Sequence, residues 1–274
     1  MKRAKNPIYL STGTFTGRIN GRDPHLLTRL AGKFCCDGFE WMLMSDFMDC
    51  IPALAAEYRA AGVVIPILHG RKSLGDALSD PEGEAEAREI FLRDCEAARA
   101  VDARRVVVHP WGVPDSDACM ERTLERLGVL CELGAREGVE PVFENCVCRE
   151  GSPLAHLEEI ARRIPNASLL VDTRASEFHR ELPATMESGL WQTNVRHVHI
   201  NDYRGGYKDW DARYPIYQPG EGQIDWRLFF DGLRAQGYGG SITLEAPAML
   251  PDGADCETLS RGLDFIRNGL GGNE

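Results

Sequence analysis

The sequence predicts an α/β protein that folds as a single closed barrel of eight parallel strands, each followed by a helix. Three observations support this. Short apolar segments rich in β-branched residues alternate with longer segments of helical period along the 274 residues. The strand-like segments are apolar nearly throughout, as in parallel sheets that are covered on both faces. Eight such units in this length match a (βα)8 barrel, which typically takes about 250 residues.

Eight segments have the composition of buried strands. In chain order they are Ile8–Thr12, Gly38–Met44, Val63–His69, Arg105–His109, Glu140–Glu144, Ser168–Asp172, Val195–Ile200 and Ser241–Glu245. Val, Ile and Leu are common in them, and β-branched residues suit extended backbone. No linker-like segment divides the series, so we expect one domain over residues 1–274.

Segments of helical period lie between these strands, and three of them carry an apolar stripe on one face. The stripes are Ala87, Ile90, Phe91, Cys95 and Ala98; Met120, Leu124, Leu127 and Cys131; and Leu154, Leu157, Ile160 and Ile164. Each segment is therefore predicted to cover the sheet with one side. An open dinucleotide-binding sheet is the alternative, but STGTFTG after the first strand lacks the GxGxxG fingerprint.

Composition restricts the possible partners and the location. The 31 basic and 42 acidic residues give a net charge of −11, and no run of five or more basic residues occurs, which disfavours nucleic acid as a partner. No apolar run approaches the roughly 20 residues of a membrane span, and no apolar segment follows the N-terminal MKRAKNP. We therefore expect a cytoplasmic protein with no nucleic-acid or membrane partner.

The nine cysteines have neither paired CxxC spacing nor the density of a disulfide scaffold. Most are expected to be reduced thiols in the core. Cys146 and Cys148 lie beside a candidate site, but Cys-x-Cys alone is a weak metal signal, so packing is the expected role of both.

Ionisable residues stand at or near the ends of seven predicted strands: Glu40, His69, His109, Glu144, Asp172, His199 and Glu245. Parallel strands of a barrel end on one rim, where barrel enzymes hold their catalytic groups. Residues far apart in the sequence are thus predicted to become neighbours.

Carboxylates and imidazoles gathered in one barrel mouth require a positive charge among them, because burial and mutual repulsion disfavour their ionised forms. A divalent cation is the simplest such charge. Glu144, Asp172, His199 and Glu245 come from four consecutive strands and offer three oxygens and one nitrogen. This set favours Mn²⁺, Mg²⁺ or Co²⁺, with Zn²⁺ as an alternative. For each residue alone, a solvated loop acid or a satisfied core histidine is the alternative.

Five motifs in the second half of the chain resemble the xylose isomerase-like TIM barrel family of sugar isomerases and epimerases: PVFENC, LLVDT, VRHVHIND, PGEGQIDW and GSITLEAP. The first half resembles the family only in its alternation of strand-like and helical segments. The family includes keto-sugar epimerases, hydroxypyruvate-type isomerases, inosose dehydratases and, more distantly, apurinic-site endonucleases. The resemblance implies a single metal held by Glu144, Asp172, His199 and Glu245.

A metal bound to adjacent oxygens of an α-hydroxy carbonyl compound acidifies the neighbouring C–H, so that a carboxylate can remove the proton and leave a cis-enediolate. The resemblance implies that Glu144 and Glu245 are both ligands and acid–base groups. We therefore expect an isomerase or epimerase of a small keto-sugar or sugar acid. A dehydratase, lyase or decarboxylase of a keto-sugar or inosose is the alternative, because the same intermediate can lose water from a β-hydroxyl.

Four of the residues expected to bind substrate also have a structural explanation. Trp111 could stack on a sugar ring or cap the barrel core. His69 and His109 could bind substrate hydroxyls or the backbone. Glu150 lies where similar epimerases have a substrate-contacting glutamate, in a stretch that equally suits a solvated loop.

Two further residues follow His199 closely. Arg204 could bind a substrate oxygen, carboxylate or phosphate. Asp202 is expected to brace either His199 or the adjoining loop.

The sixth strand departs from the family pattern. Many members have Asp-x-x-His there, whereas this chain has Asp172, Thr173, Arg174 and Ala175. In similar epimerases that histidine contacts the substrate near the metal, so Ala175 argues against a standard 3-epimerase or isomerase. His179 could substitute if the loop folds back, and Arg174 suits an anionic substrate.

Two other function classes are minor alternatives. An apurinic-site endonuclease needs ligands for two more metals, and ARYPIYQPGEG lacks the Asp-Arg-His element of that branch. A barrel that binds a sugar or metal without catalysis has no need for two carboxylates that flank the substrate. Similar proteins are dimers and tetramers, which makes a homo-oligomer the expectation.

Overall fold

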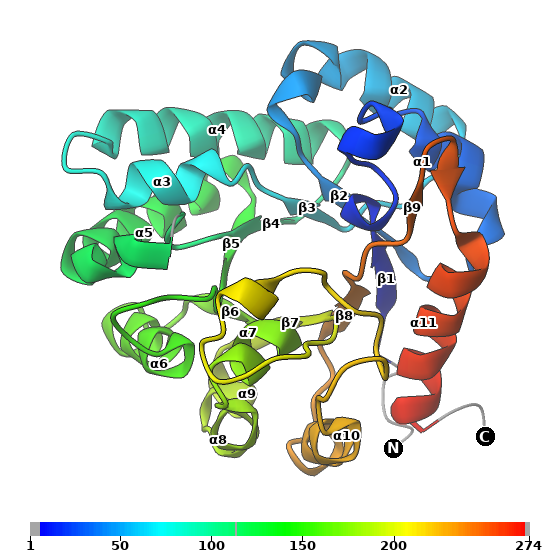
Figure 1. The fold of residues 1–274 in the computed structure, drawn as a ribbon. Helices are drawn as coiled ribbons and strands as arrows, with labels where there is room; N and C mark the ends of the chain where they lie inside the picture. The colour runs from blue at the N-terminus through cyan, green and yellow to red at the C-terminus, as the bar shows by residue number, and fades with distance from the viewer. Residues whose placement is uncertain (1–5, 113, 272–274) are drawn as a thin grey trace.

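The structure, a computed structural model, describes residues 6–112 and 114–271, and it confirms the predicted fold class (Figure 1). Eight parallel strands close into one barrel in sequence order, and β8 pairs back onto β1 through Ile242 and Ile8. The strands are β1 Ile8–Ser11, β2 Gly38–Met42, β3 Ile67–His69, β4 Arg105–Val108, β5 Glu140–Glu144, β6 Ser168–Asp172, β7 Val195–Ile200 and β8 Ser241–Leu244.

Helices surround the barrel, as the apolar stripes predict (Figure 1). They are α1 Leu26–Leu30, α2 Ile51–Ala60, α3 Ser73–Ser79, α4 Glu84–Ala100, α5 Met120–Glu137, α6 Pro153–Arg163, α7 Thr173–Phe178, α8 Leu182–Glu187, α9 Leu190–Thr193, α10 Trp226–Ala235 and α11 Cys256–Gly269. A small antiparallel pair, β9 Met249–Leu250 and β10 Gly253–Ala254, follows β8. Among the described helices, none is long and apolar enough to cross a membrane.

The predicted third strand, Val63–His69, is too long at its beginning. The ladder of β3 starts only at Ile67, after Pro66, which has no N–H to donate to a neighbouring strand. Val64 is also 56% exposed, which a buried strand residue would not be. The apolar run is therefore part strand and part connection.

Alternate residues of the strands face the barrel interior, and this alternation separates an apolar layer from a polar rim. Tyr9, Ile67, Val107, Val142 and Leu170 form a small apolar cluster of their own inside the barrel. Two residues beyond four of these positions, the chain has His69, His109, Glu144 and Asp172. Because side chains of a strand repeat with period two, these ionisable groups lie directly above the apolar layer.

A β-bulge sets the direction of the side chains of β7. Between β6 and β7 the register shifts, so that Leu169 lies opposite Val195 but Leu170 lies opposite His197. Arg196 is the extra residue of the bulge, and after it the alternation resumes with the histidines inward. As a result both His197 and His199 face the interior, while Val198 packs in the outer core.

Candidate metal centre and active site

The side chains of Glu144, Asp172, His199 and Glu245 meet at the carboxyl end of the barrel. Glu144 and Asp172 end β5 and β6, His199 lies near the end of β7, and Glu245 directly follows β8. Each offers one ligand atom, and these four atoms lie within 4.8 Å of one another. The structure thus brings together the four residues expected to hold a metal, and their role as ligands stays a prediction.

His199 lies between the two glutamates of this cluster. Its Nδ1 is 3.1 Å from Glu245 Oε2 and 3.7 Å from Glu144 Oε1. His199 is fully buried, whereas the side chain of Glu245 is 18% exposed. Glu245 is therefore the carboxylate of the cluster that is most open to a ligand entering the mouth.

Hydrogen bonds orient Asp172 from both sides. Its Oδ1 accepts from the Ala175 amide at 2.6 Å and caps α7, while its Oδ2 accepts from Asn201 Nδ2 at 2.8 Å. Asn145 Oδ1 accepts from the Asp172 amide at 2.5 Å. Burial raises the pKa of Asp172 to about 6, although the nearby Arg174 charge opposes this shift. Sequence analysis missed both asparagines, whose only signal is that each follows a predicted strand.

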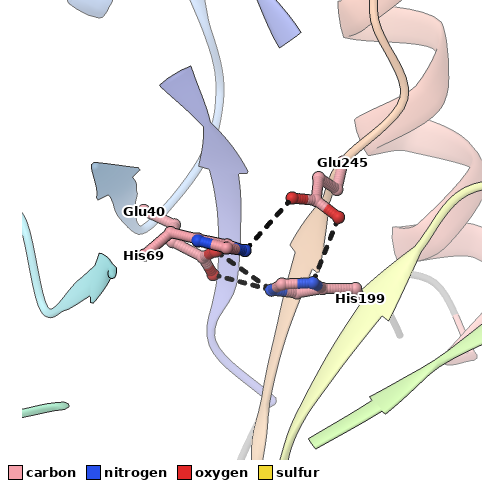
Figure 2. Close-up of side chains that lie close together, drawn as sticks. All are labelled: Glu40, His69, His199 and Glu245. Carbon is pink, nitrogen blue, oxygen red and sulfur yellow. Dashed lines mark hydrogen bonds and ion pairs between the residues drawn. The ribbon is translucent and has the colours of Figure 1, made fainter. Parts of the chain in front are cut away.

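Glu40 is the most important residue that sequence analysis left without a role. The sequence predicts it near the end of the second strand, whereas it is the middle residue of β2, fully buried inside the barrel. Its Oε2 accepts a hydrogen bond from His199 Nε2 at 3.1 Å, and its Oε1 lies 3.0 Å from the same nitrogen. Figure 2 accordingly shows His199 with one nitrogen toward Glu40 and the other toward Glu245. His199 Nδ1 is buried and has no hydrogen-bond partner. When the ring is neutral, Glu40 thus holds the proton on Nε2 and leaves the Nδ1 lone pair free for a cation.

Glu40 is also bound deeper in the barrel. Its Oε2 accepts from His197 Nε2 and from Thr243 Oγ1, both at 2.8 Å, and His197 Nδ1 lies 2.7 Å from Ser241 Oγ. These bonds fix the carboxylate from below the site. The network therefore links His199 to three polar residues that lie below the barrel mouth, namely His197, Thr243 and Ser241.

Burial and charge oppose each other throughout the cluster. Burial would raise the pKa of Glu144, but the imidazoles of His109, His199 and His69 hold it well below its usual range. Burial would lower the pKa of His199, but Glu40 and Glu245 raise it well above its usual value. Positive charge on His199 and His69, whose pKa values are raised, thus balances the carboxylates, whereas burial lowers the pKa of His109. A divalent cation would compete with those protons.

His69 and His109 line the same site. His109 Nε2 lies 2.9 Å from Glu144 Oε2, and His69 Nε2 lies 3.7 Å from that atom and 3.8 Å from Glu245 Oε1. His69 Nδ1 lies 3.0 Å from the Gly70 carbonyl, which only accepts, so this nitrogen carries a proton. Both rings therefore present Nε2 to Glu144, and His69 also presents it to Glu245; their contact with a substrate stays a prediction.

Trp111 and Glu150 have the structural roles that were the alternatives to substrate binding. Trp111 is 1% exposed, its indole N–H donates to the Val147 carbonyl at 3.1 Å, and its ring packs on His156. No face of the ring is open to a sugar. The Glu150 side chain is exposed, while its amide is held by Asp117 at 3.1 Å, as expected for a solvated loop acid.

Asp202 does not contact His199, so the loop alternative is the correct one. Its carboxylate accepts from the amides of Gly220 and Gly222 at 2.9 and 3.0 Å and from the Trp226 indole at 2.9 Å. A Cβ on Gly222 would lie 2.2 Å from Asp202 Oδ1, and Gly220 has a φ of +88°. These contacts explain physically why PGEGQIDW has glycine at both positions.

Arg204 and Arg174 occupy different environments. The guanidinium of Arg204 is exposed, lies 4.8 Å from the centre of the Tyr217 ring and donates to the Glu221 carbonyl. Arg174 is half-buried at the start of α7, where its Nη1 lies 3.4 Å from the Arg213 carbonyl. Arg174 is thus the one of the two that lies next to the cluster.

His179 does not replace the histidine that the sequence lacks at Ala175. Its Nε2 accepts from the Cys148 amide at 3.2 Å, which holds the ring against the loop after β5. Burial lowers the pKa of His179 to about 4. The ring is therefore neutral at pH 7 and supports a loop; Cys148 is buried there as a packing residue.

Replacing His179 with Gln is expected to make folding less sensitive to acid. Because the folded-state pKa lies below the unfolded value of about 6.5, the stabilising effect is complete above pH 6.5 and is lost as the pH falls toward 4. Gln can accept from the Cys148 amide without titrating. Thermal midpoints at pH 7.5 and 5.0 should therefore fall less for H179Q than for the wild type; equal decreases would contradict this.

Known proteins that are similar to this chain include sugar epimerases. A ketose 3-epimerase from Arthrobacter globiformis is 30% identical over 172 residues, which cover 60% of this chain. The match spans 50% of that protein, so it covers about half the length of this curated relative.

Solved structures of low sequence identity share the fold. A 3-keto-D-glucoside 4-epimerase from E. coli is 21% identical with a TM-score of 0.68, over 96% of this chain and 100% of that one. A D-allulose 3-epimerase from Methylomonas sp. is 16% identical with a TM-score of 0.72, over 97% of each chain. Residues 35–268 match the family described as xylose isomerase-like TIM barrel, and the chain belongs to that family.

Proposed function

We propose that this protein is a metal-dependent isomerase or epimerase of a small keto-sugar or sugar acid, which moves a proton next to a carbonyl group. The observation that carries the proposal is the convergence of Glu144 and Glu245 with Asp172 and His199, with ligand atoms within 4.8 Å of one another. The similarity to a ketose 3-epimerase supports the same reaction class.

The donor set fits a divalent cation. His199 Nδ1 and Glu144 Oε2 are buried atoms without a hydrogen-bond partner, and both belong to residues of the cluster. Glu144, Asp172, His199 and Glu245 would hold the ion, and their oxygens favour Mn²⁺, Mg²⁺ or Co²⁺, with Zn²⁺ as the alternative. When bound, such an ion supplies Lewis acidity that lowers the pKa of a C–H next to a carbonyl.

Glu245 is suited to take a proton from the substrate. Its side chain is partly exposed, so a small molecule in the mouth can reach it. Burial would raise the pKa of Glu245, but His199 outweighs this and lowers it, so the group is a carboxylate at neutral pH. A carboxylate in this position can accept a proton as a general base.

Glu144 is the second carboxylate that could exchange a proton with the substrate. Its pKa is held well below the usual range, so the proton that it returns has to reach it from the substrate or from solvent during the reaction. Its Oε2 lies 2.9 Å from His109 Nε2, within ion-pair distance but without the geometry of a hydrogen bond. His69, with Nδ1 held by the Gly70 carbonyl, is placed to orient a substrate hydroxyl through Nε2. Two carboxylates on separate strands would thus permit removal and return of a proton at different faces or carbons.

The proposal is tested by metal loading and by solvent exchange. We expect Mn²⁺, Mg²⁺ or Co²⁺ to raise the thermal midpoint of chelator-treated protein, and the loaded protein to incorporate deuterium from D₂O into a ketose or keto-sugar acid. Chelated protein is the control for exchange. A protein that binds none of these ions or Zn²⁺, or that exchanges no carbon-bound hydrogen in such a panel, would contradict the proposal.

Product mass separates the alternatives within this chemistry. Exchange without loss of water supports an isomerase or epimerase, whereas a product lighter by water or CO₂ would assign a dehydratase or a decarboxylase instead. Assembly as a homo-oligomer is a further proposal, which analytical ultracentrifugation tests directly.

A further inference from the structure

At the barrel mouth, Arg174 and Arg213 have no carboxylate in direct contact among the described residues, although Arg174 interacts with Asp172 at longer range. In the part of the chain that the structure describes, neither guanidinium forms an ion pair, and the Nε atoms of both are buried without a hydrogen-bond partner. The contact between Arg174 Nη1 and the Arg213 carbonyl, at 3.4 Å, is a long hydrogen bond to a neutral acceptor. Both residues are half-buried, where an unpaired charge is costly.

Topology places both arginines at the end of the barrel that carries the metal-ligand cluster. Arg174 is two residues beyond Asp172, and its charge acts on that carboxylate. Arg213 ends the 3₁₀ turn Asp211–Arg213, in the segment that leaves β7 and leads to α10 (yellow in Figure 1). The Arg174–Arg213 contact ties this segment to the first turn of α7.

Neighbouring groups orient Arg213 without neutralising it. Its guanidinium lies 5.1 Å from the centre of the Tyr214 ring and 5.8 Å from that of Trp210. Cation–π contacts of this kind hold a guanidinium in place but leave its N–H groups available. Asp209, an acid of the same segment, accepts instead from the amides of Ala212 and Gly206.

We propose that Arg174 and Arg213 form a subsite for an oxyanion of the substrate, so that the preferred substrate is a keto-sugar with a carboxylate or phosphate group. This inference rests on the proposed function and names the substrate class of the same site. A guanidinium matches the two oxygens of either anion with parallel N–H donors. An anion bound there would supply the direct ion pair that the two half-buried arginines lack among the described residues.

Binding measurements on Mn²⁺-loaded protein test the subsite. Isothermal titration would compare D-fructose, D-fructose 6-phosphate and D-fructuronate, which are neutral, phosphorylated and carboxylated ketoses. We expect the wild type to bind one of the two anionic sugars at least about 10-fold more tightly than D-fructose, and the tighter one identifies the anion. R174Q and R213Q should each lose about 10-fold in that affinity and keep D-fructose binding within about twofold.

Arg104 provides a matched control. It is exposed directly before β4, at the opposite end of the barrel, so R104Q makes the same change in net charge away from the subsite. R174K and R213K keep the positive charge without the planar guanidinium. We expect them to retain part of the anion affinity, which would show that the loss in R174Q and R213Q does not come from a defect in folding. R104Q should bind all three sugars like the wild type.

The outcomes separate this inference from the proposed function. A wild type that exchanges hydrogen with D-fructose and binds neither anionic sugar more tightly overturns the subsite alone. Anion affinity that survives in both R174Q and R213Q, or that falls equally in R104Q, also overturns it. A wild type that binds anionic sugars but exchanges no carbon-bound hydrogen supports the subsite and contradicts the proposed function.

Discussion

Replacing Glu245 with Gln is expected to reduce solvent-hydrogen exchange by about 100-fold or more, the range that general acid–base groups supply. Gln has nearly the same size but cannot accept a proton, and it also removes one negative charge from beside His199, whose Nδ1 lies 3.1 Å from Glu245 Oε2. The side chain of Glu245 is partly exposed at the mouth, so the fold should tolerate the change. Deuterium incorporation followed by NMR or mass spectrometry measures the effect.

Two controls separate loss of a base from loss of a metal or of the fold. Glu221→Gln changes another glutamate of the mouth loops, one whose side chain is exposed, and should leave exchange unchanged. Metal content of E245Q, measured after dialysis, shows whether the ion stays bound. If metal-loaded E245Q exchanges hydrogen at a rate within a few-fold of the wild type, Glu245 is not the base.

The barrel and the four clustered residues could be predicted because each depends on local pattern or on parallel topology. Val142 and Glu144, or Leu170 and Asp172, show the principle: an apolar residue and an ionisable one, two positions apart, both face the interior. Once the strands are parallel, their ends share one rim regardless of the distance along the chain. The apolar layer of the interior, which includes Ile67 and Val107, could be predicted from the buried apolar runs alone.

The partnership of Glu40 with His199 could not be predicted in the same way. The two residues are 159 positions apart, on β2 and β7, which are not neighbours in the barrel. Their contact depends on side chains that meet across the interior, and it also depends on the bulge at Arg196 that turns both histidines of β7 inward. Neither feature has a signal in hydrophobic period or strand order.

Loop conformations explain the remaining differences. For Asp202 the sequence leaves open a contact with His199 or with a loop. Its carboxylate accepts hydrogen bonds from the loop amides of Gly220 and Gly222. For Trp111 the sequence leaves open a contact with a ligand or with the core. The hydrogen bond from its indole N–H to the Val147 carbonyl holds the ring in the core. Such contacts depend on how each connection folds back over the barrel, which residue type alone does not determine.

Replacing Glu40 with Gln is expected to weaken divalent-metal binding by about 10- to 100-fold, although Glu40 would not touch the ion. Burial would raise the pKa of Glu40, but His199 and His197 hold it well below its usual range, so the native residue is a buried carboxylate. That charge makes the His199 ring more basic and holds its proton on Nε2. The neutral Gln can still accept from Nε2 but removes the charge, whereas Glu40→Leu removes both.

Metal affinity should therefore decrease in the order wild type, E40Q, E40L, as measured by competition with a coloured chelator on protein whose fold is checked by circular dichroism. Thr243→Val is the matched control, because Thr243 Oγ1 donates to the same carboxylate at 2.8 Å without touching His199 through that hydroxyl. We expect T243V to change affinity by less than about threefold. Nitrogen-15 shifts of His199 in the metal-free proteins should also show that the ring loses its second proton at a lower pH in E40Q than in the wild type, because Glu40 raises the pKa of His199. A group that acts on the ion through His199 has to change the protein's affinity for Mn²⁺ when it is replaced. A folded E40Q protein that binds Mn²⁺ as tightly as the wild type would therefore show that the buried carboxylate only stabilises the barrel interior.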